Sequence, residues 1–130
     1  MWEIIPGLSV IIAERVVKPK VEDKAHHNYG FAANLCSDKP VWVKAVSVLL
    51  TLWTTVIFII SLTLAGSKML KIGLSFLLGG AFSNTYDRVK RGYVVDYLRI
   101  PIGPKFIRKF IWNIGDFAII IGALMVALGA

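Results

Sequence analysis

The sequence predicts an all-α integral membrane protein: a bundle of four transmembrane helices with one short extended, β-like segment at the membrane interface. Of the 130 residues, 56% are apolar, more than an ordinary soluble domain carries. These residues are gathered into long runs, and residues 45–65 hold no charge. Such a run can cross a hydrocarbon layer of about 30 Å at about 1.5 Å per residue. The length predicts one membrane domain, residues 1–130.

The first helix is expected at residues 2–17. Its uncharged core, residues 4–13, is too short to span a membrane, so we expect a short helix that ends at the surface. A signal peptide is not expected, because the start lacks a basic region and no small-residue cleavage site follows. A polar loop is expected to follow, from Lys18 to Pro40.

The other three helices are expected at residues 42–65, 69–86 and 110–128. A basic segment between the last two contains Pro101 and Pro104, so it cannot form one continuous helix. Within it, residues 93–97 are rich in Tyr and Val and favour an extended backbone. An extended backbone in lipid must be paired or face water, so we expect this segment at the interface.

The distribution of charge along the chain bears on its orientation in a membrane and on the partners it can bind. It carries 15 Lys and Arg against 8 Asp and Glu, and 13 of the basic residues lie in or beside the two longer loops. The positive-inside rule places such loops in the cytoplasm, although a cationic loop can instead bind anionic lipid on either side. A single cysteine excludes an internal disulfide or a thiolate cluster, and no HExxH motif is present. We therefore expect no metal.

Three carboxylates stand out because they lie at the ends of the apolar segments: Asp87, Asp96 and Asp116. A carboxylate in or beside hydrocarbon is costly and usually marks a functional site. Asn84 precedes Asp87 by three residues, and Asn113 precedes Asp116 by three, so each pair is expected on one helical face. The asparagines can supply the hydrogen bonds that buried carboxylates need.

The chemistry depends on whether Asp96 folds against Asp116. Two such carboxylates in a low-dielectric site do not both ionise, so one keeps a proton near neutral pH. The ionised acid can take a proton from water while the protonated acid polarises a carbonyl. Peptide hydrolysis is the natural reaction for this pair.

Each acid also has a structural interpretation. Asp87 can form a salt bridge with the adjacent Arg88, Asp116 a structural hydrogen bond, and Asp96 can be a plain surface carboxylate. The alternative function is a small non-enzymatic bundle in which the acids bind a cation or relay protons.

Three segments carry a family resemblance: residues 79–88 (GGAFSNTYDR), 91–97 (RGYVVDY) and 113–116 (NIGD). In order and spacing they resemble the GG-A-x-x-N-x-x-DR, VVD and N-x-A-D blocks of the lipoprotein signal peptidase (signal peptidase II) family. The first half departs more. Glu14 to Lys18 stands where the family has Asp-Gln-x-x-Lys, and Asn28 to Ala33 is similar to Asn-x-Gly-Ala-Ala-Phe. Gly115 stands where the family usually has Ala.

The resemblance implies an intramembrane aspartic endopeptidase without metal or other cofactor. Asp96 and Asp116 would be the catalytic pair. The supporting or substrate-binding residues would be Asn84, Asp87, Arg88, Asn113, Asn28, Lys18 and Glu14.

The implied substrate is a bacterial prolipoprotein whose cysteine carries diacylglycerol, cut on the amino side of that cysteine. The resemblance also implies a multi-pass, monomeric protein of the bacterial cytoplasmic membrane that contacts phospholipid and no nucleic acid. Its active site would lie at the outer face, against the positive-inside rule. A family member that binds precursors without cutting them is the remaining alternative.

Overall fold

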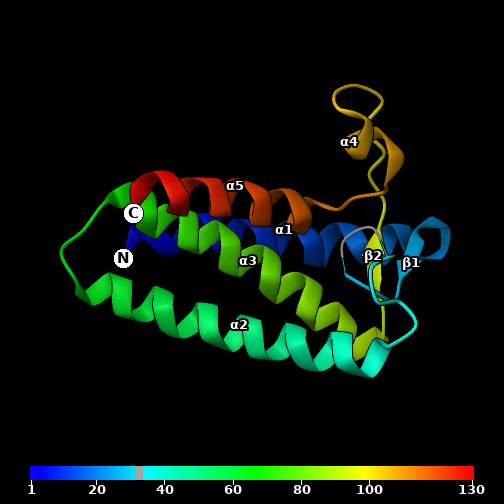
Figure 1. Ribbon diagram of the computed structural model, residues 1–130, viewed down its shortest axis with the longest axis horizontal. Coiled ribbons are helices and arrows are strands. Elements are labelled where there is room, and N and C mark those ends of the chain that lie inside the picture. Colours follow the sequence, from blue (N-terminus) through cyan, green and yellow to red (C-terminus); the bar gives the residue numbers. More distant parts are fainter. Residues whose placement is uncertain (32–33) are drawn as a thin grey trace.

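The computed structural model describes residues 1–31 and 34–130. Four long helices run side by side along the molecule (Figure 1): α1 (Ile5–Val21), α2 (Pro40–Thr63), α3 (Lys68–Arg91) and α5 (Ile114–Gly129). The shorter elements are η1 (Trp2–Ile4), η2 (Glu22–Lys24), β1 (His26–Asn28), β2 (Val94–Asp96) and α4 (Lys105–Lys109). The two strands and α4 lie at the end of the bundle away from both termini (Figure 1).

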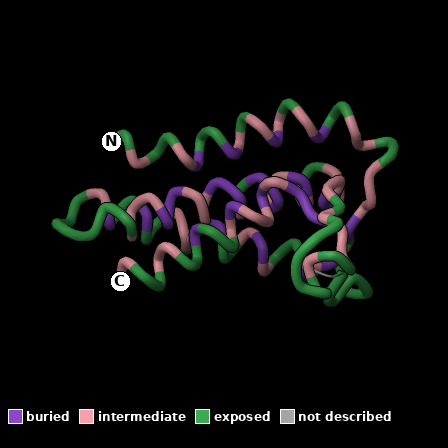
Figure 2. Tube along the Cα trace, turned by 90° about the horizontal axis from the view of Figure 1, so that it is seen from above, coloured by how far each residue is buried: buried purple, intermediate pink, exposed green. Residues whose placement is uncertain are grey.

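Helix α3 is the centre of the bundle, because it packs against α1, α2 and α5. Glycines allow the closest of these contacts. A Cβ on Gly79 would lie 2.6 Å from the carbonyl oxygen of Gly7 in α1, and one on Gly80 would collide with the carbonyl oxygen of Gly115 in α5. The buried side of the helices faces this centre, and the outer sides are exposed (Figure 2). Small residues therefore bring the backbones together, as they do in membrane bundles.

Helix α1 ends at Val21 and not at Val17, although Pro19 lies in its last turn. The prediction of a polar loop from Lys18 onward was therefore wrong at its start. The consequence is that Lys18 follows Glu14 by one helical turn and shares its face. Both side chains are fully buried.

Helix α3 also runs further than predicted, to Arg91 and not to Tyr86. Gly92 follows as its C-cap and adopts a left-handed conformation (φ 85°) that glycine tolerates at a helix C-terminus. Helix α5 begins later than predicted, at Ile114, because Asn113 caps it. Helix α2 is shifted by two residues, to 40–63.

The extended segment at 93–97 contains β2, but its partner was not predicted. β1 pairs with β2 in antiparallel register, with His26 opposite Asp96 and Asn28 opposite Val94. A further bridge joins Leu98 to Trp112. These pairings join the extended segment to the strand that follows α1 and to the residues that precede α5, and β2 also packs against α3. The last two residues of the Asn28–Ala33 motif lie outside the described residues.

Within residues 1–31 and 34–130, one helix, α2, is long and apolar enough by itself to cross a membrane. Helix α5 is equally apolar in character but has 16 residues. Much of the surface of α2 consists of exposed large apolar side chains, among them Leu49, Trp53 and Ile60. The number of spanning helices, four, stays a prediction.

Candidate active site

Asp96 and Asp116 come from different elements and meet at Asn113. The side-chain amide of Asn113 donates to Asp96 Oδ1 at 2.9 Å. Its backbone N–H donates to Asp116 Oδ2 at 3.0 Å. One residue therefore holds both carboxylates. The pairing of Leu98 with Trp112 brings the end of β2 next to Asn113.

Asn113 can hold both acids because it is the N-cap of α5 and not part of the helix. Its Oδ1 accepts the backbone N–H of Asp116 at 2.8 Å, and Asp116 bonds back to the backbone of Asn113, which completes a capping box. The shared helical face predicted for these residues is replaced by this reciprocal cap. The cap leaves the amide nitrogen of Asn113 free to reach Asp96.

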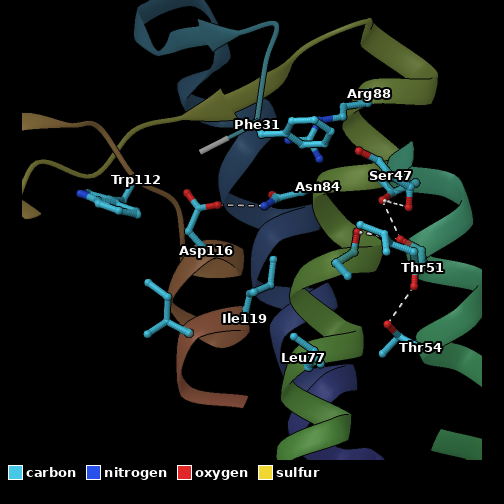
Figure 3. A pocket seen from close by; sticks show the side chains of 14 residues that line it. Phe31, Ser47, Thr51, Thr54, Leu77, Asn84, Arg88, Trp112, Asp116 and Ile119 are labelled. Carbon is cyan, nitrogen blue, oxygen red and sulfur yellow. Dashed lines mark hydrogen bonds between the residues drawn. The ribbon is translucent and has the colours of Figure 1, made fainter. Parts of the chain in front are cut away.

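Asn84 supports Asp116 from α3. Its side-chain nitrogen donates to Asp116 Oδ1 at 3.0 Å (Figure 3). Its oxygen accepts from the amide of Asn113 at 3.1 Å and from Lys18 Nζ at 3.2 Å. All these side chains except Asp116 are buried, and Asp116 is half-buried. Both polar atoms of the Asn84 side chain thus take part in orienting the site.

Asp96 is 3% exposed, so its interpretation as a plain surface carboxylate was wrong. Asn28 of β1 donates to its Oδ2 at 3.1 Å. Burial is the main cause that raises the pKa of Asp96 to about 7, and the charge of Asp116 adds to it. Hydrogen bonds from Asn28 and Asn113 act in the opposite direction. Asp96 can therefore hold or release a proton near neutral pH.

Asp87 forms a buried cluster of charges beside these acids. Its carboxylate accepts from Lys18 at 2.6 Å, from Arg91 at 2.6 Å and from Arg15 at 3.0 Å. The partner predicted for it, Arg88, was wrong. Because α3 continues past Asp87, Arg91 lies one turn further on the same face, whereas Arg88 points about 100° away.

The carboxylate of Asp87 also reaches the strand that carries Asp96. Its Oδ2 accepts the backbone N–H of Val95 at 3.2 Å. Lys18 connects the two groups of residues, because its ammonium contacts both Asp87 and Asn84. A side chain with a structural role is thus coupled to the position of Asp96.

Arg88 faces a cavity instead. One terminal nitrogen donates to the carbonyl oxygen of Gly30 at 3.0 Å, and the guanidinium lies 5.6 Å from the ring of Phe31. Its Nε is buried and has no hydrogen-bond partner among the described residues. The Arg88 side chain lines the cavity, and a guanidinium carries several N–H donors, so it can donate to a ligand bound there.

The cavity has a volume of about 410 Å³. Asn84, Arg88 and Asp116 lie at its polar end (Figure 3). Its other walls are mainly apolar side chains and hydroxyl groups: Phe31, Ser47, Leu50, Thr51, Thr54, Leu77, Ala81, Thr85, Trp112, Ile119 and Ile120. Asp96 does not line it and faces a separate opening with His26 and Arg99. The two acids therefore border different cavities. Asn113 is hydrogen-bonded to both acids.

The hydroxyl groups of α2 in this cavity were not predicted. Ser47, Thr51 and Thr54 follow one another at intervals of four and three residues, which places them on one helical face. Thr51 and Thr85 share a hydrogen bond of 2.7 Å between their Oγ1 atoms. This periodicity of hydroxyl residues in an uncharged apolar run was the signal available in the sequence.

Glu14 holds the start of α5 from the other side. Its Oε1 accepts the backbone N–H of Gly115 at 2.5 Å, a donor that a helix N-terminus otherwise leaves unpaired. Its Oε2 accepts the hydroxyl of Tyr97 at 2.9 Å. Burial and the nearby charge of Glu14 raise the pKa of Tyr97. A Cβ at Gly115 would lie 3.2 Å from Glu14 Oε1 and 3.1 Å from Asn113 Oδ1.

We expect Glu14 and Gly115 to depend on each other. Gly115→Ala crowds Glu14 and should lower stability by about 1–3 kcal/mol. Glu14→Asp is one methylene shorter and should leave the Gly115 N–H unpaired, at a cost of about 1–3 kcal/mol. In the double variant the shorter acid makes room for the methyl group. Thermal unfolding should therefore show a loss of stability in the double variant that is smaller than the sum of the two single losses.

Gly66→Ala is the matched control, because nothing lies within 4 Å of a Cβ at that glycine. It should leave unfolding nearly unchanged. Strictly additive effects of Glu14→Asp and Gly115→Ala would contradict the dependence of one residue on the other.

Among the residues that the structure describes, no group of three His, Cys, Asp or Glu side chains is arranged to hold a metal ion. The site consists of carboxylates, asparagines and cations from α1, α3, β1, β2 and α5.

The chain is similar in sequence to one protein family and to named members of it. A family model described as signal peptidase (SPase) II matches residues 8–130. Proteins named lipoprotein signal peptidase from Alteromonas mediterranea and Vibrio parahaemolyticus are 31% and 36% identical over 109 and 110 residues. The match covers 78% of this chain but 56% and 60% of those proteins, so the chain spans little more than half of their length.

Two solved structures, each described as a bacterial membrane enzyme, share the fold. Their TM-scores are 0.78 and 0.75 at 22% and 23% identity, and the match covers 97% of this chain and 85% and 90% of theirs. The family model matches most of the chain, and the curated relatives agree with it. The chain therefore belongs to the signal peptidase II family.

Proposed function

We propose that this chain is an aspartic endopeptidase that removes the signal peptide from diacylglyceryl-modified prolipoproteins, on the amino side of the lipid-modified cysteine. The observation that carries this proposal is that Asn113 is hydrogen-bonded to both Asp96 and Asp116. The names of the curated relatives support the substrate class.

The two acids would act on one water molecule and one peptide bond. One carboxylate takes a proton from the water, whose oxygen attacks the carbonyl carbon, while the other acid donates a proton to the carbonyl oxygen. The C–N bond then breaks and the leaving nitrogen takes a proton. Asp96 suits the donor role, because its pKa of about 7 leaves it substantially protonated at neutral pH.

The cavity beside Asp116 suits the apolar side of such a substrate. It is lined largely by apolar side chains, and its polar end holds the guanidinium of Arg88. We assign to Arg88 the role of donating to a carbonyl oxygen of the bound substrate, which would orient the scissile bond toward Asp116. Asn84 and Asn113 would keep Asp116 in position for the attack.

The helices and the two acids would have a defined position in the membrane. The four long helices would all cross the bacterial cytoplasmic membrane as a monomeric bundle, with phospholipid against the exposed apolar side chains of α2. The acids lie at the end of the bundle that carries β1, β2 and α4, and this end would be the outer face (Figure 1). A lipid-anchored cysteine is held at the membrane interface, so the cleavage site would meet the acids at that depth.

The location of Asp96 favours the peptidase over a proton or cation relay. A relay needs acids along the transmembrane helices. Asp96 instead ends a strand at one end of the bundle, next to Asn113.

The experiment that tests the proposal uses the purified chain in detergent with a diacylglyceryl-modified precursor peptide. We expect one cut on the amino side of the modified cysteine, identified from the masses of both products. The same precursor without the lipid should be cut much more slowly. An intact lipid-modified precursor would leave the chain as a binding protein without peptidase activity.

A further inference from the structure

Asp96 borders two adjoining cavities that share no lining residue with the 410 Å³ cavity. Their volumes are about 160 and 420 Å³, and they share His26, Asp96, Arg99 and Ile111. We call the two together the Asp96 cleft. Its remaining lining residues are Val21, Lys24, Ala25, Asn28, Asn34, Tyr97, Lys109 and Phe110. The walls of this cleft hold four charged side chains (Lys24, Asp96, Arg99 and Lys109), whereas the cavity beside Asp116 holds two, Arg88 and Asp116.

The cations of the Asp96 cleft come from three separate segments. Lys24 ends η2, Arg99 follows β2, and Lys109 ends α4. All three are exposed, and none is within ion-pair distance of an acid among the described residues. The basic side chains deeper in this end of the molecule differ, because Arg15, Lys18 and Arg91 all bind Asp87.

Asp96 is the one carboxylate in the lining of the cleft, and within the described residues it forms no ion pair with any of the three cations. Asp96 has both of its oxygens occupied, Oδ1 by the amide of Asn113 and Oδ2 by that of Asn28. With three cations against one carboxylate, the lining carries a net positive charge around an opening that leads to Asp96. Such a site attracts an anionic group.

We propose that the Asp96 cleft binds the part of the substrate that follows the lipid-modified cysteine, and that Lys24, Arg99 and Lys109 favour acidic side chains in that part. This inference rests on the proposed function. A peptide bond cut between Asp96 and Asp116 has one end of the substrate on each side of the pair. The apolar cavity fits the signal peptide and the lipid. The charged cleft fits the hydrophilic chain that leaves the membrane.

The size of the effect follows from the exposure of the cations. Exposed ion pairs are individually weak, so two or three of them should change kcat/KM by about threefold to twentyfold in total. The preference should also weaken at high ionic strength, because salt screens charges at about 10 Å in 0.1 M salt and about 3 Å in 1 M salt.

The test uses the full chain in a zwitterionic detergent with three lipid-modified precursor peptides. They differ at the second and third residues after the cysteine, which are two Asp, two Ser or two Lys. We expect kcat/KM to fall in that order, with about tenfold or more between the Asp and Lys peptides at low salt. In Arg99→Gln/Lys109→Gln the ratio between the Asp and Lys peptides should shrink toward one.

Arg108→Gln is the matched control. Arg108 is also an exposed cation of α4, but it bonds to the carbonyl oxygen of Gly103 and does not line the cleft. This variant should keep the full ratio. Cleavage of all three peptides at equal rates by the unchanged chain would overturn the inference while leaving the peptidase proposal intact. Failure to cut any of them would instead count against the proposed function.

Anionic lipid is the competing source of negative charge. If Arg99→Gln/Lys109→Gln loses a stimulation by phosphatidylglycerol in mixed micelles but keeps the full Asp-to-Lys ratio, the cations bind head groups and the inference is wrong.

Discussion

Replacing either Asp96 or Asp116 by Asn is expected to lower kcat for cleavage of a lipid-modified precursor by at least about 10³-fold, within the range of general acid–base catalysis. Asparagine has nearly the same shape as aspartate but can neither take nor hold the transferred proton. Because the two acids act on one bond, the double variant should be no worse than either single variant. The rate is measured with the lipid-modified precursor under saturating conditions.

Folding must be separated from chemistry in these variants. Each acid accepts hydrogen bonds on both oxygens, so an Asn in its place loses one of them. We therefore expect a modest loss of stability, with the amount of protein in the membrane unchanged. Asp38→Asn is the control, because Asp38 is exposed, and it should keep full activity. Retained cleavage in either Asp96→Asn or Asp116→Asn would exclude the proposed pair.

Asp87→Asn is expected to lower the free energy of unfolding by about 3–5 kcal/mol, the usual cost of removing one partner from a buried ion pair. Asp87 is fully buried, and so is Lys18, its partner at 2.6 Å. The substitution leaves the ammonium of Lys18 and the guanidinium of Arg91 without their shared counter-charge. Thermal or denaturant unfolding in detergent measures the loss.

A second substitution tests the cause of this loss. Lys18→Met in the Asp87→Asn background removes the buried charge, so it should restore part of the lost stability. Asp23→Asn, a change at an exposed acid, should have little effect and serves as the control. If Asp87→Asn unfolds normally but is inactive, its main role is to hold Asp96 through the N–H of Val95.

The sequence predicted the parts of the fold that depend on long patterns. Uncharged apolar runs indicated α2, α3 and α5, because each pattern extends over several turns. β1 could not be predicted, since three residues, His26 to Asn28, are too few to show alternation. Its existence depends on pairing with β2, which lies about 70 residues further along the chain.

The sequence indicated which residues form the site better than it indicated which of them contact one another. The spacing of Asn113 and Asp116 indicated that they act together, but a helical face was predicted where a capping box exists. The partner of Asp87 could not be predicted, because it depends on where α1 and α3 end. Once α1 continues to Val21, Lys18 reaches Asp87, and once α3 continues to Arg91, that arginine reaches it as well.

The dependence of cleavage on pH tests most directly whether Asp96 and Asp116 share one proton. Burial and the charge of Asp116 raise the pKa of Asp96 to about 7. Asp96 is therefore protonated below that pH and loses its proton above it. If Asp96 is the proton donor, kcat should fall about tenfold per pH unit above about pH 7. The apparent value belongs to the pair of acids.

In the Asn28→Ala variant, the pH dependence of kcat should shift in a known direction. The hydrogen bond from Asn28 lowers the pKa of Asp96, so its removal should move the fall in kcat to higher pH. We predict that kcat declines above about pH 7 and that this decline moves to higher pH in Asn28→Ala. A kcat that stays constant up to about pH 9, unaltered by Asn28→Ala, would contradict it.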